Sequence, residues 1–318
     1  MPASAKKNRP NIIIIVADDM GYSDLGCYGG EIPTPHLDAL ASDGVRFSQF
    51  YTTARCSPSR ASLLTGLHPH QTGIGILTAD DRPIGYAGQL SSENETIAEM
   101  LAPSGYATAA VGKWHLTSDV WTPNDAWPTR RGFDSFYGTL SGCGSFFDPK
   151  TLVRDETPIA EATQDPDFFY TEAITREASQ RISEAATEGQ PFFLYVAYTA
   201  PHWPLHAKDS DLERMRGIFD EGWDVLRTRR AKRQKTLGIV GDAARLSPRD
   251  PDTPAWGPGD APAVADEQNG SLRSAGRVAR PRRWHDSRHR THKWCRGRHD
   301  RDLPLRQRCV PRGDPTPR

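Results

Sequence analysis

Short apolar runs alternate along the chain with stretches of helical pattern. The run from Ile12 to Val16 is continuous and β-branched, which is typical of a strand buried on both faces of a sheet. Two later apolar runs indicate further strands, and proline and glycine mark the ends of the helices between them. The predicted strands are 11–16, 107–111 and 192–198, and the predicted helices are 34–44, 95–101 and one that ends at 188. This alternation predicts an α/β layered fold with a largely parallel central sheet.

Polar side chains follow each of these strands. Asp18 and Asp19 come directly after the first strand, Lys113 and His115 after the second, and His202 after the third. In open α/β sheets, ligands bind in the crevice outside the carboxyl ends of the strands. The three segments therefore predict one shared site at that edge.

Each of these groups also has an ordinary structural interpretation. Adjacent carboxylates such as Asp18 and Asp19 are most often a helix N-cap with a solvated neighbour. After a buried strand, however, two ionised carboxylates repel each other and need a cation, and their hard oxygens favour Ca²⁺ or Mg²⁺. Lys113 and His115 are a surface lysine and a structural histidine in the ordinary interpretation, but residues two apart on an extended chain point to one face. In the ordinary interpretation, His202 is a loop histidine packed on the neighbouring tryptophan.

A cysteine motif is the most specific feature of the chain. Residues 56–60 read CSPSR, and residues 63–66 read LLTG. Pro58 suits the first turn of a helix and Gly66 its end, so Cys56 is predicted at or just before a helix N-terminus. The free backbone N–H groups there favour a thiolate, an alkoxide or a bound oxyanion. The alternatives are a small buried cysteine packed at a turn and, for Arg60, a helix-surface charge.

This motif resembles the signature of the type I sulfatases of the alkaline-phosphatase-like superfamily, which is Cys (or Ser)-x-Pro-x-Arg followed by Thr-Gly. Three other segments are similar to family segments: DDMGY at residues 18–22, GKWHL at 112–116 and APHWPL at 200–205. The resemblance extends from about Asn11 to about Trp256. It implies an alkaline-phosphatase-like α/β/α sandwich.

The resemblance also implies a chemistry. Cys56 would be oxidised by a formylglycine-generating maturation enzyme, and the hydrated aldehyde would be the nucleophile. Asp18, Asp19 and residue 56 would hold Ca²⁺, with Mg²⁺ less favoured. Arg60 and Lys113 would supply positive charge, His115 would act as the base and His202 would protonate or position the leaving alcohol. The implied substrate is a small-molecule or carbohydrate sulfate ester. A phosphomonoesterase or phosphonate hydrolase on the same scaffold is the alternative, disfavoured because Cys56 heads a complete sulfatase signature.

The sequence suggests three regions: an N-terminal tail (1–10), the N-terminal portion of a sulfatase-like catalytic domain (11–256), and an Arg/Pro-rich tail (257–318). After Ile239 the chain has no Ile, Phe, Tyr or Met, a composition that predicts disorder. The resemblance implies an Asp-Asn pair and a second lysine in this last quarter. Neither is recognisable there, so the sheet is expected to be incomplete at its C-terminal side.

A frameshift near Trp256 is our hypothesis for this tail. Permitted codons for residues 301–316, read one base later, encode a sulfatase-like strand and loop. A natural low-complexity extension is the alternative. The competing functional hypothesis is a truncated, frameshifted sulfatase fragment without catalytic activity.

Composition and charge limit the classes of binding partner that the sequence predicts. The 318 residues carry 40 Lys and Arg against 40 Asp and Glu, with a pI near 7.2, which argues against a nucleic-acid binder. The basic run 227–235 is predicted to be a solvated helix face, and the turn-like segment 142–147 to line the pocket. No signal-peptide-like segment and no apolar run near the length of a membrane span is present. A soluble, cytoplasmic protein without membrane partners is predicted.

Overall fold

The computed structural model describes residues 9–253, 255 and 256. The predicted tail 257–318, its expected disorder and the frameshift hypothesis lie outside these residues, as do residues 1–8. The strands are β1 (Ile12–Val16), β2 (Ala107–Lys113), β3 (Ser135–Thr139), β4 (Leu152–Arg154), β5 (Thr157–Pro158) and β6 (Phe192–Ala197). The helices are α1 (Pro35–Asp43), α2 (Cys56–Thr65), α3 (Ile97–Leu101), α4 (Glu161–Gln164), α5 (Tyr170–Glu188), α6 (Asp209–Arg214) and α7 (Trp223–Thr236).

These strands form one six-stranded sheet in the order β1-β6-β2-β3-β4-β5. β1, β6, β2 and β3 run parallel, whereas β4 and β5 are antiparallel additions at one edge. Ala197 pairs with Val16 on one side and with Gly112 on the other, so the carboxyl ends of the three strands are level. The predicted α/β fold with a largely parallel sheet is confirmed.

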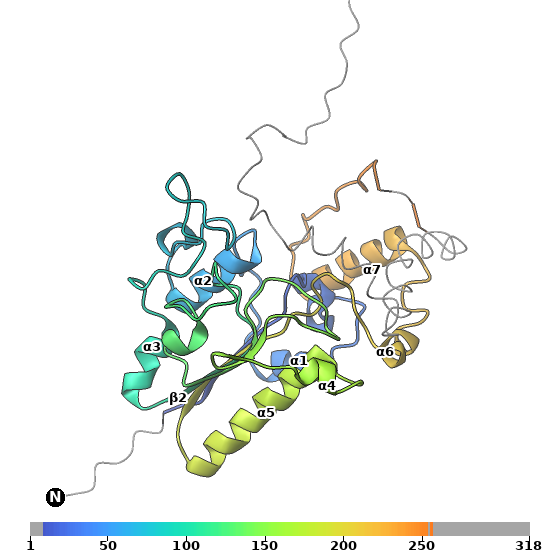
Figure 1. Cartoon of the computed structure of the whole chain (residues 1–318). Helices are drawn as coiled ribbons and strands as arrows, with labels where there is room; N and C mark the ends of the chain where they lie inside the picture. Colours follow the sequence, from blue (N-terminus) through green and yellow to red (C-terminus); the bar gives the residue numbers. More distant parts are fainter. Residues whose placement is uncertain (1–8, 254, 257–318) are drawn as a thin grey trace, which may run out of the picture.

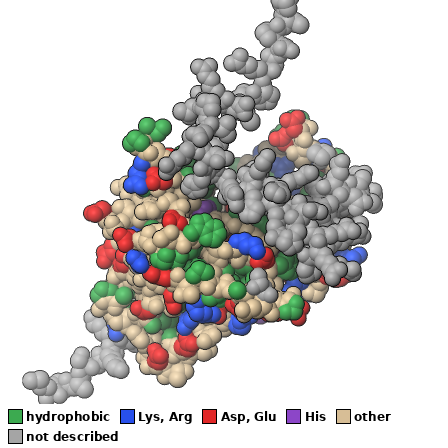
Figure 2. All heavy atoms as spheres, in the orientation of Figure 1, with side chains coloured by type: hydrophobic (Ala, Val, Ile, Leu, Met, Phe, Trp, Pro, Cys, Tyr) green, Lys and Arg blue, Asp and Glu red, His purple; other side chains and the backbone are tan. Residues whose placement is uncertain are grey.

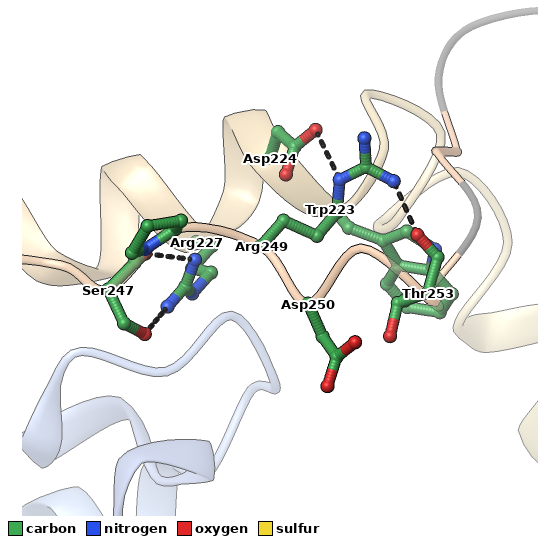
Figure 3. Close-up of a pocket in the computed structure, with 8 residues that line it drawn as sticks. Trp223, Asp224, Arg227, Ser247, Arg249, Asp250 and Thr253 are labelled. Carbon is green, nitrogen blue, oxygen red and sulfur yellow. Dashed lines mark hydrogen bonds and ion pairs between the residues drawn. The ribbon is translucent and has the colours of Figure 1, made fainter. Parts of the chain in front are cut away.

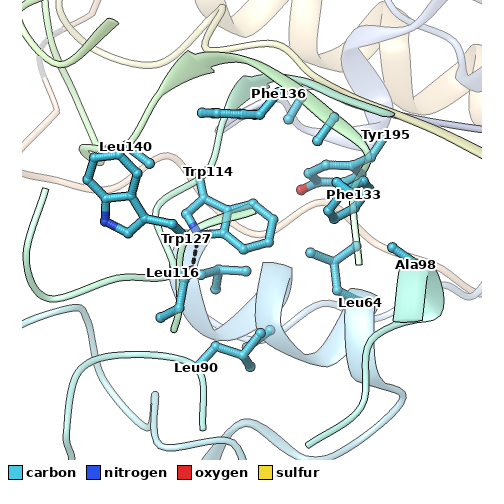
Figure 4. Close-up of a cluster of buried hydrophobic side chains, with 14 of the residues drawn as sticks. Leu64, Leu90, Ala98, Trp114, Leu116, Trp127, Phe133, Phe136, Leu140 and Tyr195 are labelled. Atoms are coloured by element: carbon cyan, nitrogen blue, oxygen red, sulfur yellow. Dashed lines mark hydrogen bonds between the residues drawn. The ribbon is translucent and has the colours of Figure 1, made fainter. Parts of the chain in front are cut away.

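Helices cover both faces of this sheet. Along β6, Phe193 and Tyr195 pack into a core that α2 and α3 cover, while Leu194 and Val196 face α5 on the other side. Figure 1 shows α5 running along one face, with α2 and α3 on the opposite side. The first core centres on Trp114, whose indole N–H donates to the carbonyl oxygen of Ala126 at 2.8 Å (Figure 4). The layers are therefore helix, sheet and helix.

The prediction that β1 is buried on both faces is wrong. Its side chains alternate between part-buried and exposed, and Ile13 and Ile15 are 44% and 58% exposed. β1 is an edge strand that pairs only with β6 among the described strands. Ile12, Ile14 and Val16 pack against the Trp114 core, whereas Ile13 and Ile15 belong to neither hydrophobic core of the described residues. A β-branched run specifies a strand but does not show how many of its faces are covered.

The helix α7 is held against the N-terminal part of the chain. Arg230 donates to Glu31 and, at 3.0 Å, to Asp24, and Arg233 also reaches Glu31 at 3.0 Å. Burial alone would raise the pKa of Glu31, but the bonds from Arg230 outweigh it and the pKa lies below its ordinary value. The basic run 227–235 is thus partly a docking face rather than a fully solvated one.

None of the helices in the described part of the chain combines the length and the apolar composition that crossing a bilayer needs. On the face drawn in Figure 2, acidic and basic side chains are interspersed rather than gathered by sign.

Candidate active site

The carboxyl ends of β1 and β6 are tied together by their backbones. The N–H of Tyr198 donates to the carbonyl oxygen of Val16 at 2.8 Å, and the N–H of Asp18 donates to that of Ala200 at 3.1 Å. β2 ends at Lys113, next to β6. The predicted convergence of the three strand ends is therefore present in the fold.

The helix α2 begins at Cys56, as predicted. Arg55 is the extended N-cap residue, and Gly66 ends the helix in the left-handed region with φ 71°. Pro58 lies in the first turn, where its missing N–H costs no helical hydrogen bond. Cys56 is a free, part-buried thiol. The helix N-terminus thus presents residue 56 to the strand ends.

Asp18, Arg60 and Lys113 form a buried cluster of charges. Oδ1 of Asp18 lies 3.2 Å from Nη2 of Arg60, and Oδ2 accepts from Nζ of Lys113. Arg60 also donates through Nη1 to the carbonyl oxygen of Lys113 at 2.8 Å. Burial lowers the pKa of Lys113, the charge of Arg60 lowers it further, and Asp18 opposes both effects. Arg60 is not a helix-surface charge, because it is 2% exposed and links α2 to the ends of β1 and β2.

His115 faces residue 56 directly. Its Nδ1 lies 3.3 Å from Sγ of Cys56 and 3.1 Å from Oγ of Ser57. Burial lowers the pKa of His115 well below its ordinary value, and the charges of Lys113 and Arg60 lower it further. The imidazole is therefore neutral near pH 7. The predicted extended geometry is wrong in detail, since β2 stops at Lys113 and His115 has φ 58°.

The second histidine lies on the open side of the site. Nε2 of His202 is 3.5 Å from Oδ2 of Asp19, and its Nδ1 is 2.5 Å from the carbonyl oxygen of Trp203. The side chain of Asp19 is 63% exposed and that of His202 is 19% exposed. These two groups are near each other, but solvent reaches them.

The carboxylates of Asp18 and Asp19 are the type of ligand that a hard divalent cation prefers, but they are too few to complete its coordination. Their carboxylate oxygens are the ligands that Ca²⁺ prefers, and Ca²⁺ takes about six to eight of them. Within residues 9–253, 255 and 256, no three or more His, Cys, Asp or Glu side chains are grouped to hold a metal. Both oxygens of Asp18 already contact cationic side chains.

Three further residues adjoin the site and were not predicted. Ser57 contacts His115, and the hydroxyl of Tyr195 accepts from Nη1 of Arg60 at 3.3 Å. Oγ1 of Thr199 and Nε of Arg60 are buried without a hydrogen-bond partner. Tyr195 faces Arg60 because alternate residues of β6 point to the α2 side of the sheet. The sequence signal for it was therefore its position in the strand.

A surface hollow along α7 is unrelated to this site. Its volume is about 450 Å³, and it is lined by residues of α7 and of segment 247–253 (Figure 3). Arg227 donates to Ser247 at 2.8 Å and Arg249 pairs with Asp224 at 3.5 Å. The charged groups of the hollow are thus engaged locally, and none of the predicted site residues lines it.

Comparison with known proteins shows the family of the chain. The sulfatase family model matches residues 10–263. The chain belongs to the sulfatase family. This sulfatase is 40% identical to an arylsulfatase of Klebsiella aerogenes over 254 residues, covering 76% of this chain and 54% of that protein. It is 36% identical to human arylsulfatase A, covering 67% of this chain and 45% of that protein.

A solved structure supports the same assignment. The crystal structure of Ps i-CgsB shares 32% sequence identity with this sulfatase at a TM-score of 0.58, covering 72% of this chain and 56% of that one. The predicted family and fold are confirmed. The chain spans about half the length of the curated relatives it matches.

Proposed function

We propose that this sulfatase chain carries the catalytic half-site for hydrolysis of sulfate monoesters. One observation supports this most directly: the signature Cys56 starts α2 at 3.3 Å from the imidazole of His115, at the strand ends where Arg60 and Lys113 are buried. A nucleophile, a neutral base and fixed positive charge are thus grouped. That is the arrangement that covalent ester hydrolysis needs.

Oxidised to formylglycine by a maturation enzyme, residue 56 would supply a hydrated aldehyde whose hydroxyl attacks the ester sulfur. Arg60 and Lys113 hold the sulfate oxygens through charge. As the sulfur–oxygen bond to the alcohol breaks, Nε2 of His202 gives a proton to the leaving oxygen. Nδ1 of His115 then accepts the proton of the second hydroxyl of residue 56, so that the aldehyde re-forms, the carbon–oxygen bond to the transferred sulfate breaks and sulfate leaves. Addition of water would restore the hydrate. In balance, the ester and water become an alcohol, sulfate and a proton.

We also propose that Asp18, Asp19 and residue 56 contribute ligands to a Ca²⁺ site, with Mg²⁺ the less favoured ion. Bound there, the cation would neutralise sulfate oxygens. Replacing Asp19 by Asn should leave the fold intact, because its side chain is 63% exposed. Calcium affinity measured by calorimetry should fall about tenfold or more. Equal calcium affinities of the variant and the unaltered chain would show that Asp19 is not a ligand of the ion.

The proposed substrate is a small-molecule or carbohydrate sulfate ester. Ps i-CgsB, which this chain resembles, has been solved in complex with k-i-k-neocarrahexaose. That complex supports a carbohydrate, as does the solvent exposure of Asp19 beside His202, where the alcohol part of the ester would lie.

The test begins with co-expression of the chain and a formylglycine-generating enzyme. Mass spectrometry of the peptide containing residue 56 should show exchange of sulfur for oxygen with loss of two hydrogens. Converted protein should hydrolyse p-nitrophenyl sulfate in Ca²⁺ buffer. Cys56→Ala should abolish turnover, whereas Cys27→Ala, which alters the other free thiol among the described residues, should not.

Converted protein without hydrolysis would favour the competing hypothesis of an inactive fragment, which the half-length match to the relatives motivates. Faster hydrolysis of p-nitrophenyl phosphate than of the sulfate would favour a phosphomonoesterase.

A further inference from the structure

The segment after β3 runs beside the active-site end of β2. The N–H of Trp114 donates to the carbonyl oxygen of Thr139 at 2.8 Å, and the N–H of His115 donates to that of Leu140 at 3.2 Å. Backbone hydrogen bonds thus continue to join the two segments past the ends of both strands. It brings Gly142 to the imidazole of His115.

Gly142 leaves no room for a side chain. A Cβ atom there would lie 2.3 Å from both Cε1 and Nε2 of His115, about 1 Å inside ordinary contact, which begins near 3.4 Å. The backbone of Gly142 does not lie in the left-handed region, so conformation does not require glycine here. Space beside the ring is the only reason the described structure offers.

The imidazole has little room to retreat. Its other nitrogen, Nδ1, which is bonded to Cε1, lies 3.1 Å from Oγ of Ser57 and 3.3 Å from Sγ of Cys56. The ring is held between α2 and Gly142, and His115 is 8% exposed. A shift of about 1 Å would therefore be taken up at the contact with residue 56.

The segment that carries Gly142 is held at both ends. The N–H of Ser141 donates to Oγ1 of Thr151 at 3.1 Å, and the two hydroxyls lie 2.8 Å apart. At the other end, the N–H of Phe146 donates to Nδ1 of His206 at 3.2 Å, and the two rings meet edge to face. The segment therefore resists moving away from His115.

We infer that Gly142 is a positioning residue, whose missing side chain sets how closely His115 approaches residue 56. The effect on turnover rests on the proposed function, but the effect on the histidine does not. Misplacement of a catalytic group by about 1 Å costs on the order of a hundredfold in rate. Gly142→Ala should therefore lower kcat on p-nitrophenyl sulfate about a hundredfold and leave KM within about twofold, because the sulfate-binding cations are not displaced.

Gly144→Ala is the matched control. It adds the same methyl group two residues along, where no atom lies within 4 Å of the added Cβ. Its kcat, melting temperature and histidine spectrum should equal those of the unaltered chain. In Gly142→Ala, the ¹⁵N resonance of His115 Nδ1, assigned by its absence in His115→Ala, should move away from its position in the unaltered chain.

A double-mutant cycle tests the contact without turnover. Gly142→Ala should lower the melting temperature when His115 is present and have no effect in the His115→Ala background, where the ring is gone. Equal losses in both backgrounds would overturn the inference, as would an unshifted His115 resonance with unchanged kcat in Gly142→Ala. If the unaltered chain hydrolyses no sulfate ester, the proposed function fails, and the cycle and the spectrum still decide the role of Gly142.

Discussion

Removing the negative charge of Asp18 should strongly destabilise the fold. Asp18→Asn keeps the size of the side chain but leaves two cations, Arg60 and Lys113, without their buried counter-charge. Arg60 is 2% exposed and Lys113 is 1% exposed, so water cannot replace the carboxylate. Breaking a buried ion pair by removing one partner costs about 3–5 kcal/mol. In a domain of this size, that corresponds to a fall of about 6–20 °C in the melting temperature.

The assay is thermal unfolding followed by circular dichroism, with calcium chelated so that no bound ion contributes. Asp80→Asn is the matched control, because Asp80 pairs with Arg82 on the surface and its loss should not change the melting temperature. Adding Lys113→Met to Asp18→Asn should recover part of the loss, since one unpaired charge disappears. If Asp18→Asn melts like Asp80→Asn, or the double variant melts no higher than Asp18→Asn, the reasoning from buried charge is refuted.

Three further outcomes are expected. Burial lowers the pKa of His206 to about 4, and its neutral ring accepts a hydrogen bond from the N–H of Phe146. As pH falls below 6.5, this histidine is therefore protonated in the unfolded chain before it is protonated in the folded chain. The free energy of unfolding should therefore decrease between pH 6.5 and 4, by on the order of 1–2 kcal/mol since His206 is only part-buried, and His206→Gln should remove that slope in urea titrations. Gly112→Ala should give insoluble protein, because its Cβ would lie 2.0 Å from the carbonyl oxygen of Ala197. Gly66→Ala, also at positive φ but with nothing within 4 Å, should stay soluble and lose only about 1–2 kcal/mol; equal solubility of the two would contradict this reading. Lys208→Ala should lower the melting temperature by no more than about 4 °C, since its pair with Glu172 is exposed, and a larger loss would show that the pair is not screened.

The sequence predicted the elements well where local chemistry decides them. The helix predicted at 34–44 is α1 at Pro35–Asp43, with proline at its start, and the one expected to end at 188 is α5. The helix predicted from Glu95 starts two residues later, because Thr96 is the N-cap and its hydroxyl accepts from the N–H of Glu99. Proline, glycine and capping residues act within one turn, so their effect can be read locally.

Long-range contacts were not predictable in the same way. The exposure of Ile13 and Ile15 depends on which elements reach the edge strand, and the four isoleucines of β1 look alike in the sequence. The contact between Gly142 and His115 depends on backbone hydrogen bonds between the segments that follow β2 and β3. The convergence of Asp18, Lys113 and His202 was predictable because parallel strands place their carboxyl ends at one edge.

The charge of the buried half-site bears on the choice between sulfate and phosphate. Asp18 carries one negative charge, Arg60 and Lys113 carry one positive charge each, and His115 is neutral, so these four groups sum to one positive charge. A sulfate monoester carries one negative charge and balances this sum, whereas a phosphate monoester, whose second pKa is about 6, approaches two at neutral pH. With calcium chelated, so that the ion of the proposed metal site does not change this sum, the second charge of the phosphate would lack a partner, which is costly. In calcium-free buffer, binding of p-nitrophenyl phosphate to the chain with unmodified Cys56, measured by calorimetry, should therefore strengthen relative to binding of p-nitrophenyl sulfate as pH falls below 6. A constant ratio of the two affinities across that range would show that ester charge does not set the preference.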